Sequence, residues 1–123
     1  MSANENKFPR DQRLGGELAF AAVYAAGAKQ SRAPLVAYSK PNQLSHCRGG
    51  LSVSRRVGTA VRRNRIKRML RESIRLLQKD LPKGYDCVLV VRPHDPMPLV
   101  EYQKILTALI VKGHDHWSKK PKE

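Results

Sequence analysis

The sequence predicts an α+β protein, a small two-layer α-β sandwich in which three helices pack on one mixed sheet of about four strands, in the order αβββαβα. Three observations lead to this fold class. The 123 residues, 41% of them hydrophobic, are enough for one domain with a real core. Two or three strands fit between the first and the second helical segment. The run Cys87–Val91 is almost entirely apolar, which is typical of a strand buried on both faces in the middle of a sheet.

The first helix is expected from Gly16 to Ala26, because this segment is rich in alanine, and Gly27 is expected to form its C-terminal cap. Strands are expected at Leu35–Tyr38 and Leu51–Ser54, and the second of these alternates apolar and polar residues as a half-buried strand does. Turn residues lie between the two segments. The sequence therefore predicts that these two strands form a hairpin with a long loop.

The second helix is expected from Ala60 to Gln78, with Thr59 as its N-cap. After the apolar strand, a proline-rich connection leads to a last helix from Leu99 to Lys112, which Gly113 is expected to end. A single α-β domain is predicted over residues 8–113. Residues 1–7 and the polar, basic segment 114–123 are expected to be mobile.

Charge and cysteine content exclude several function classes. The chain has 24 Lys and Arg against 10 Asp and Glu, a formal net charge of +14, which indicates an anionic partner and argues against an enzyme for cationic substrates. No apolar run reaches the roughly 20 residues of a membrane helix.

Cys47 and Cys87 are too few for a disulfide scaffold or a thiolate zinc site, so reduced thiols in a cytoplasmic protein are expected. The segment Leu18–Ala28 resembles the core of a secretory leader, but the charges before it balance to zero, whereas a leader needs a positive front end.

The densest positive charge lies in and just before the second predicted helix. Nine of the 24 cations fall within residues 55–75, where Glu72 is the one opposing charge. On a helical wheel, the apolar side holds Ile66, Met69, Leu70, Ser73, Ile74, Leu76 and Leu77. The other side holds Asn64, Arg65, Lys67, Arg68, Arg71 and Arg75. Ordinary solvated faces mix both signs, because like charges three or four residues apart repel. A phosphate-binding face therefore explains this pattern better than a solvated face does, and the planar guanidinium of Arg suits that role.

The stretch GLSVSRRVGTAVRRNRIKRMLRESIR, from Gly50 to Arg75, resembles the signature of the bacterial ribonuclease P protein subunit. The family pattern has a strand ending in Ser-Val-Ser, a basic pair, Val-Gly, and an Arg-Asn-Arg core followed by Ile-Lys-Arg. In this chain these are Ser52–Ser54, Arg55-Arg56, Val57-Gly58, Arg63–Arg65 and Ile66–Arg68. The Phe8-Pro9-Arg10 segment and the strand end Val88–Pro93 also fit, so the resemblance spans about Phe8 to Lys112.

This resemblance implies the protein partner of a large catalytic RNA, with one protein per RNA. In that family the ribonucleoprotein is an endonuclease of tRNA processing, which removes the 5′ leader from precursor tRNA by phosphodiester hydrolysis. The reaction depends on Mg²⁺ held mainly by the RNA subunit and the substrate. The RNA carries the catalytic centre, whereas the protein binds the leader and broadens the substrate range. The resemblance further implies a cytoplasmic location, no membrane partner and a left-handed crossover, against the general right-handed rule.

The resemblance also implies roles for individual residues. The residues expected to bind the RNA subunit are Arg55, Arg56, Arg62, Arg63, Asn64, Arg65, Lys67, Arg68 and Arg71. The leader is expected in a cleft between the first helix and the sheet, lined by Phe20, Tyr24 and Tyr38, because rings stack on the bases of a single strand. Core packing is the alternative for these three rings, and for Tyr24 the two interpretations are equally supported. Leu35 stands where relatives often have an aromatic residue.

No residue pattern predicts catalytic groups or a resident metal in the protein itself. Asp80, Asp86 and Asp95 are isolated in sequence, whereas a two-metal nuclease needs clustered carboxylates. His114 and His116 lie in the predicted tail and indicate at most weak metal binding. A ribosomal or general RNA-binding protein without a role in catalysis is the alternative function. A protein-only nuclease is a third hypothesis, for which the sequence offers no chemistry.

Overall fold

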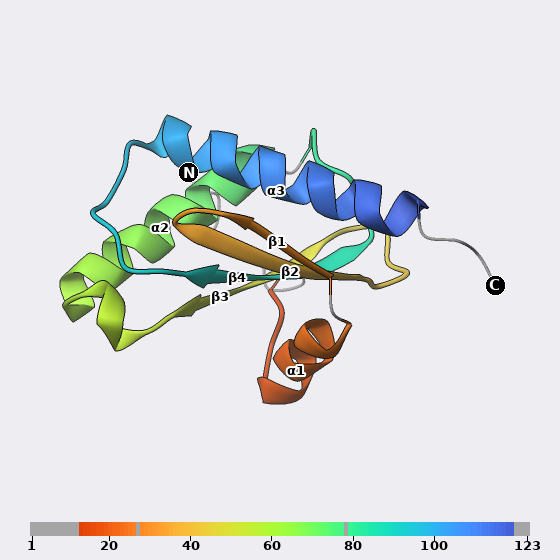
Figure 1. Cartoon of the computed structure of the whole chain (residues 1–123), viewed down its shortest axis with the longest axis horizontal. Coiled ribbons are helices and arrows are strands. Elements are labelled where there is room, and N and C mark those ends of the chain that lie inside the picture. The colour runs from red at the N-terminus through yellow and green to blue at the C-terminus, as the bar shows by residue number, and fades with distance from the viewer. Residues whose placement is uncertain (1–12, 27, 78, 120–123) are drawn as a thin grey trace, which may run out of the picture.

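The computed structural model describes residues 13–26, 28–77 and 79–119; the features predicted at residues 1–7, Gly27 and Gln78 lie outside these ranges. The elements are α1 (Glu17–Ala25), β1 (Ala28–Arg32), β2 (Leu35–Pro41), β3 (Arg48–Val53), the short 3₁₀ helix η3 (Arg55–Val57), α2 (Ala60–Leu77), β4 (Tyr85–Val91) and α3 (Leu99–Lys119). Three α-helices and a four-stranded mixed sheet confirm the predicted fold class. Figure 1 shows α2 and α3 on one face of the sheet and α1 on the other.

The strand order is β1-β2-β4-β3. β2 pairs antiparallel with both β1 and β4, and β3 pairs parallel with β4. The predicted central place of β4 is confirmed, with Val88, Leu89 and Val91 buried. α2 is the crossover that joins the parallel strands β3 and β4, and the hand implied for that crossover stays a prediction.

The predicted hairpin between the strands at Leu35 and Leu51 is wrong. β4 lies between β2 and β3, so these two strands do not pair. β4 takes this place because an almost wholly apolar strand buries most surface with a neighbour on each side and a helix layer on each face. The hairpin in the structure joins β1 to β2 instead. β1 has the sequence AKQSR, in which only Ala28 is buried, so this polar edge strand gives no clear strand pattern.

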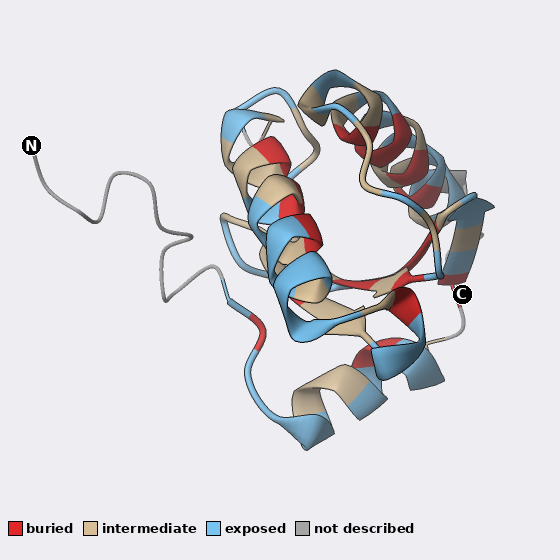
Figure 2. Ribbon diagram, turned by 90° about the vertical axis from the view of Figure 1, so that its left-hand side faces the viewer, coloured by how far each residue is buried: buried red, intermediate tan, exposed pale blue. Residues whose placement is uncertain are grey.

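Alternate side chains of the sheet enter two separate cores. The larger core lies under α2 and α3, where Ile66, Leu70 and Tyr102 pack on Leu35 and Leu89. The smaller core lies under α1 and is built on Leu14, Val23 and Val88. In Figure 2 the buried residues of α2 and α3 face the sheet, and the exposed ones face outward. The outer face of α2 is thus available for a partner.

The prediction that the last helix ends at Gly113, followed by a mobile tail, is wrong for residues 114–119, because α3 continues to Lys119. Tertiary contacts stabilise the extra turns. The Tyr85 hydroxyl and His114 Nδ1 are 2.8 Å apart, and Trp117 Nε1 donates to Ser39 Oγ at 3.2 Å. Gly113 is buried against Ser39, so closely that an added Cβ would lie 3.2 Å from Ser39 Oγ. Gly113 therefore does not end the helix. It allows α3 to pack closely on β2.

Candidate nucleic-acid interface

The geometry of α2 separates a packing side from a cationic side. Thr59 Oγ1 accepts a hydrogen bond from the backbone N–H of Arg62 at 3.2 Å, which confirms Thr59 as the N-cap. Ile66, Leu70 and Ser73 are buried against the sheet, and Ser73 Oγ donates to the carbonyl of Met69 at 2.8 Å. Leu76 departs from the predicted apolar side, since 44% of it is exposed.

Most of the predicted RNA-binding residues of α2 lie on its exposed side. The exposed residues are Arg62, Asn64, Arg65, Arg68 and Arg71, and the half-buried ones are Arg63 and Lys67. The Nε of Arg63 is buried and has no hydrogen-bond partner among the described residues. We call the seven residues just named the basic face. The structure therefore brings these predicted residues together on one helix, and the six that are charged are all cations.

Two arginines of α2 are engaged by carboxylates. Arg75 is half-buried and binds Glu72 with two hydrogen bonds, of 3.0 and 2.5 Å, and the hydrogen bonding from Arg75 lowers the pKa of Glu72. Arg75 was predicted on the cationic side, but its charge is neutralised within the protein. Arg62 Nη2 lies 3.2 Å from the exposed carboxylate of Asp95, which belongs to the connection before α3. The spacing of three residues between Glu72 and Arg75 is compatible with a pair on one helix, whereas the pairing of Arg62 with Asp95 leaves no trace in the sequence pattern.

The basic pair Arg55-Arg56 lies in η3, between β3 and the start of α2, and both residues are exposed. Val57, the last residue of η3, is buried and fixes this turn to the core. Gly58 follows with φ of 149°, and the aliphatic stem of Arg62 lies over it, so that an added Cβ would be 2.6 Å from Arg62 Cδ. The lack of a side chain at Gly58 thus lets the two basic segments approach each other.

The three predicted leader-binding rings gather on the other face of the sheet. Phe20 and Tyr38 are half-buried against the smaller core, and 37% of Tyr24 is exposed. The rings of Tyr24 and Tyr38 meet edge to face, with centroids 4.8 Å apart. Phe20 points at the backbone of β3, since a Cβ added at Gly50 would lie 2.3 Å from Phe20 Cζ. Each ring therefore has packing contacts, and their role toward a leader stays a prediction.

The contact between Phe20 and Gly50 gives a stability prediction. We expect Gly50→Ala to lower the free energy of unfolding by about 1–3 kcal/mol, because the new methyl group must push the ring and α1 away from β3. Urea unfolding of both proteins measures this difference. Gly15→Ala is the matched control, since an added Cβ there meets nothing within 4 Å. Equal stability of the two variants would show that α1 moves away from β3 without loss of folding free energy.

Arg48 is a cation of the α1 side that the sequence pattern did not single out. It binds the carboxylate of Asp86 through two hydrogen bonds, of 2.8 and 2.6 Å, and Asn42 donates to the same carboxylate at 2.8 Å. Asp86 is 2% exposed. Burial by itself raises the pKa of Asp86, but the hydrogen bonds from Arg48 and Asn42 outweigh it and hold the pKa below its ordinary value. The signal that could have indicated a buried partner is Asp86 itself, a lone acidic residue in the apolar strand Tyr85–Val91.

The same network positions the chain before β3. Asn42 Nδ2 also donates to the carbonyl of His46 at 3.1 Å, and Asn42 Oδ1 accepts from the backbone N–H of Leu44 at 2.8 Å. These bonds fix the loop that leads into Arg48. The Asp86 network therefore places Arg48 at the start of β3, on the face that also carries Tyr38 and Phe20.

The described residues contain no group of three His, Cys, Asp or Glu side chains that is placed to hold a metal ion. His114, for which the sequence indicates at most weak metal binding, contacts the hydroxyl of Tyr85. Cys47 and Cys87 are both free thiols, as predicted. No helix within the described ranges is long and apolar enough to cross a membrane.

Comparison with known proteins identifies the family. The family model described as Ribonuclease P matches residues 8–112, which include the basic face, η3 and all three rings. The chain belongs to the ribonuclease P protein family. This family provides the protein subunit of ribonuclease P, which acts in tRNA 5′ processing.

Relatives and solved structures of the ribonuclease P protein family cover most of this chain. The ribonuclease P protein component of Clostridium botulinum (strain Loch Maree) is 39% identical over 107 residues, which are 86% of this chain and 89% of that protein. The component of Exiguobacterium sibiricum is 33% identical over 116 residues, 92% of this chain and 98% of its own. The solved Staphylococcus aureus RNase P protein is 30% identical, with a TM-score of 0.70 over 82% of this chain and 93% of that one. The solved Thermotoga maritima RNase P protein is 26% identical, with a TM-score of 0.70 over 76% of this chain and 89% of that one.

Proposed function

We propose that this chain is the protein subunit of a ribonuclease P ribonucleoprotein that binds two polyanions at once, the catalytic RNA and the 5′ leader of precursor tRNA. One observation carries this proposal. The molecule has a face of cations on α2 and a group of aromatic rings on the opposite side of the sheet. Membership in the ribonuclease P protein family supports the same assignment.

In this proposal the basic face and the pair Arg55-Arg56 bind the RNA subunit. Their guanidinium and ammonium groups neutralise phosphates and release counterions, which favours association at low salt. The leader lies along the sheet face beside α1, where Tyr24, Tyr38 and Phe20 provide surfaces for unpaired bases. Arg48 lies on the same face and adds a cation for the leader backbone.

Hydrolysis of the phosphodiester bond belongs to the RNA subunit in this proposal, with Mg²⁺ held by the RNA and the substrate. The side chains of the described residues do not form a metal-ligand set that fits a resident Mg²⁺. The protein holds the substrate in the position needed for cleavage, and it extends the range of precursors that the RNA accepts. The complex acts in the cytoplasm, with one protein for each RNA.

Reconstitution tests this function. The isolated protein is expected to cleave no RNA, and its addition to a matching ribonuclease P RNA at low Mg²⁺ is expected to restore removal of the leader. Cleavage by the protein after all RNA has been digested away would favour the protein-only nuclease. Failure to stimulate a matching RNA would favour a general RNA-binding protein. Equal binding of precursor tRNA and mature tRNA to the complex would favour the same alternative.

Tyr38 gives a prediction specific to the leader. We expect Tyr38→Leu to weaken binding of precursor tRNA to the reconstituted complex by about 5- to 150-fold, because stacking of one base on a ring contributes about 1–3 kcal/mol. Binding of mature tRNA, which lacks the leader, is expected to stay unchanged. Tyr85→Leu is the matched control, because Tyr85 contacts His114 of α3 on the other side of the sheet. A parallel loss for both tRNAs would assign Tyr38 to core packing alone.

A further inference from the structure

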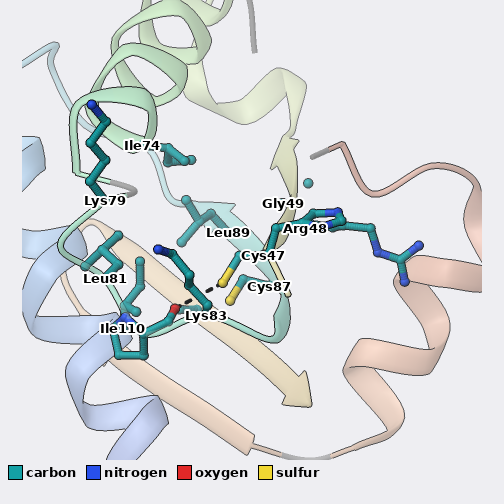
Figure 3. Close-up of a pocket in the computed structure, with 14 residues that line it drawn as sticks. Cys47, Arg48, Gly49, Ile74, Lys79, Leu81, Lys83, Cys87, Leu89 and Ile110 are labelled. Atoms are coloured by element: carbon teal, nitrogen blue, oxygen red, sulfur yellow. Dashed lines mark hydrogen bonds between the residues drawn. The ribbon is translucent and has the colours of Figure 1, made fainter. Parts of the chain in front are cut away.

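A cavity of about 210 Å³ lies on the α2–α3 side of the sheet, beside the last turns of α2. Its walls come from six parts of the chain, which include Ala37 of β2 and residues 46–50 at and before the start of β3. Ile74 belongs to α2, Ile110 to α3, and Leu89 and Cys87 to β4, and the loop of residues 79–83 closes one side. Figure 3 shows Leu81, Ile110 and Leu89 around this space, whereas Arg48 points away from it. Protein interiors contain few voids larger than a water molecule, so an apolar cavity of this size needs an explanation.

Both cysteines of the chain line this cavity. Figure 3 shows their sulfur atoms side by side, and Cys47 Sγ donates to the carbonyl of Pro82 at 3.1 Å, which fastens the 79–83 loop over the cavity. Burial raises the pKa of both thiols, that of Cys87 to about 12, so at neutral pH they remain uncharged S–H groups. The two thiols therefore add no formal charge to the cavity.

The mouth of the cavity is positively charged. Lys79 and Lys83 both line it and are exposed, and neither forms an ion pair with a described residue. Lys79 comes just after the C-terminal end of α2, where a cation is favoured in any case by the helix dipole, so Lys83 is the more informative of the two. No carboxylate is among the described lining residues; Asp80 is exposed in the same loop but does not line the cavity.

We propose that this cavity binds a small organic anion, with one apolar group about the size of a single ring inside the cavity and a carboxylate or phosphate group at Lys83 and Lys79. The size fits, because an apolar cavity of about 150 Å³ in another protein binds benzene. The charge fits, because the apolar interior ends at two cations and no lining anion. The site lies beyond the cations of the basic face along α2, so the proposal does not depend on the proposed function.

Thiol labelling of the full chain provides a direct test, since its only two thiols line the cavity. The probe is 3-phenylpropionate, compared with 3-phenylpropan-1-ol, which lacks the charge, and propionate, which lacks the ring. We expect 3-phenylpropionate to bind with a dissociation constant of about 1 mM or below and to slow alkylation of both cysteines by N-ethylmaleimide several-fold at saturation. Propionate at the same concentration is expected to give no protection. Unchanged labelling at about 10 mM 3-phenylpropionate would overturn the proposal.

Variants then separate the cavity from general anion binding. Lys83→Gln is expected to weaken 3-phenylpropionate about 3- to 10-fold and to leave 3-phenylpropan-1-ol unchanged, because only the charged probe uses the lysine. Lys104→Gln, an exposed lysine on α3 outside the cavity, is the control that should change neither. Leu81→Trp fills the cavity from its outer loop and should abolish protection by both ring-bearing probes. Equal weakening by the Lys83 and Lys104 variants would identify nonspecific anion binding and overturn the proposal.

Discussion

Replacing Arg65 and Arg68 together by Ala will weaken binding of the ribonuclease P RNA and flatten the dependence of that binding on salt. Both side chains are exposed on the basic face, and neither forms an ion pair with a described residue. Each phosphate contact that is lost lowers the slope of log K against log salt concentration by about 0.7–0.9, so the double variant should lose roughly 1.4–1.8 units of slope. Measuring affinity for the RNA at several salt concentrations gives the slope directly.

A control with the same change in net charge shows whether position matters. Lys104 and Lys112 are exposed on α3, away from the basic face, and their double replacement by Ala also removes two positive charges. We expect its slope to match that of the unmodified protein. Neither pair is buried, so both variants should fold, and the Arg65/Arg68 variant is also relieved of like-charge repulsion along α2. Identical slopes for the two variants would mean that net charge, and not the basic face, determines RNA binding.

The basic face could be predicted from the sequence because its pattern is local. Nine cations in 21 residues and the spacing of Ile66, Leu70 and Ser73 determine which side of α2 packs, whatever the rest of the chain does. The central position of β4 was likewise visible in five consecutive residues that are almost all apolar. Both predictions depend on a property of a single element, and the structure confirms them.

The features that the sequence did not reveal depend on contacts between distant segments. Pairing of β2 with β4 and of β3 with β4 leaves no trace in the strands themselves, so the neighbours Leu35–Tyr38 and Leu51–Ser54 were wrongly paired. The helix α3 continues past Gly113 because Ser39 and Tyr85, more than 20 residues away, contact its last turns. The cavity beside Cys47 and Cys87 likewise forms only where β2, the 46–50 segment, α2, the 79–83 loop, β4 and α3 meet. The identity of Gly113, Cys47 or Cys87 in the sequence does not reveal which distant residues each one contacts.

Removing the partner of a buried carboxylate is the change from which we expect the largest loss of stability. Arg48→Met leaves Asp86, 2% exposed, with Asn42 as its remaining hydrogen-bond donor among the described side chains. We expect the free energy of unfolding at neutral pH to fall by about 2–3 kcal/mol. This lies below the loss for a fully buried pair, because the Arg48 side chain is 37% exposed and solvent already screens it. Urea unfolding measures the loss.

The pH dependence of the same variant identifies the cause, because its sign reverses. In the unmodified protein the pKa of Asp86 is lowered, so the unfolded chain binds more protons, and the contribution of Asp86 is present above about pH 4 and is lost as pH falls below that. Without Arg48, burial of the carboxyl dominates and raises its pKa, so the folded variant binds more protons and becomes less stable as pH rises from about 4 to about 7. Adding Asp86→Asn to the variant removes the titrating group and should abolish this reversed slope. A variant that instead gains stability with rising pH, as the unmodified protein does, would show that Arg48 is not what keeps the Asp86 carboxylate charged in the fold.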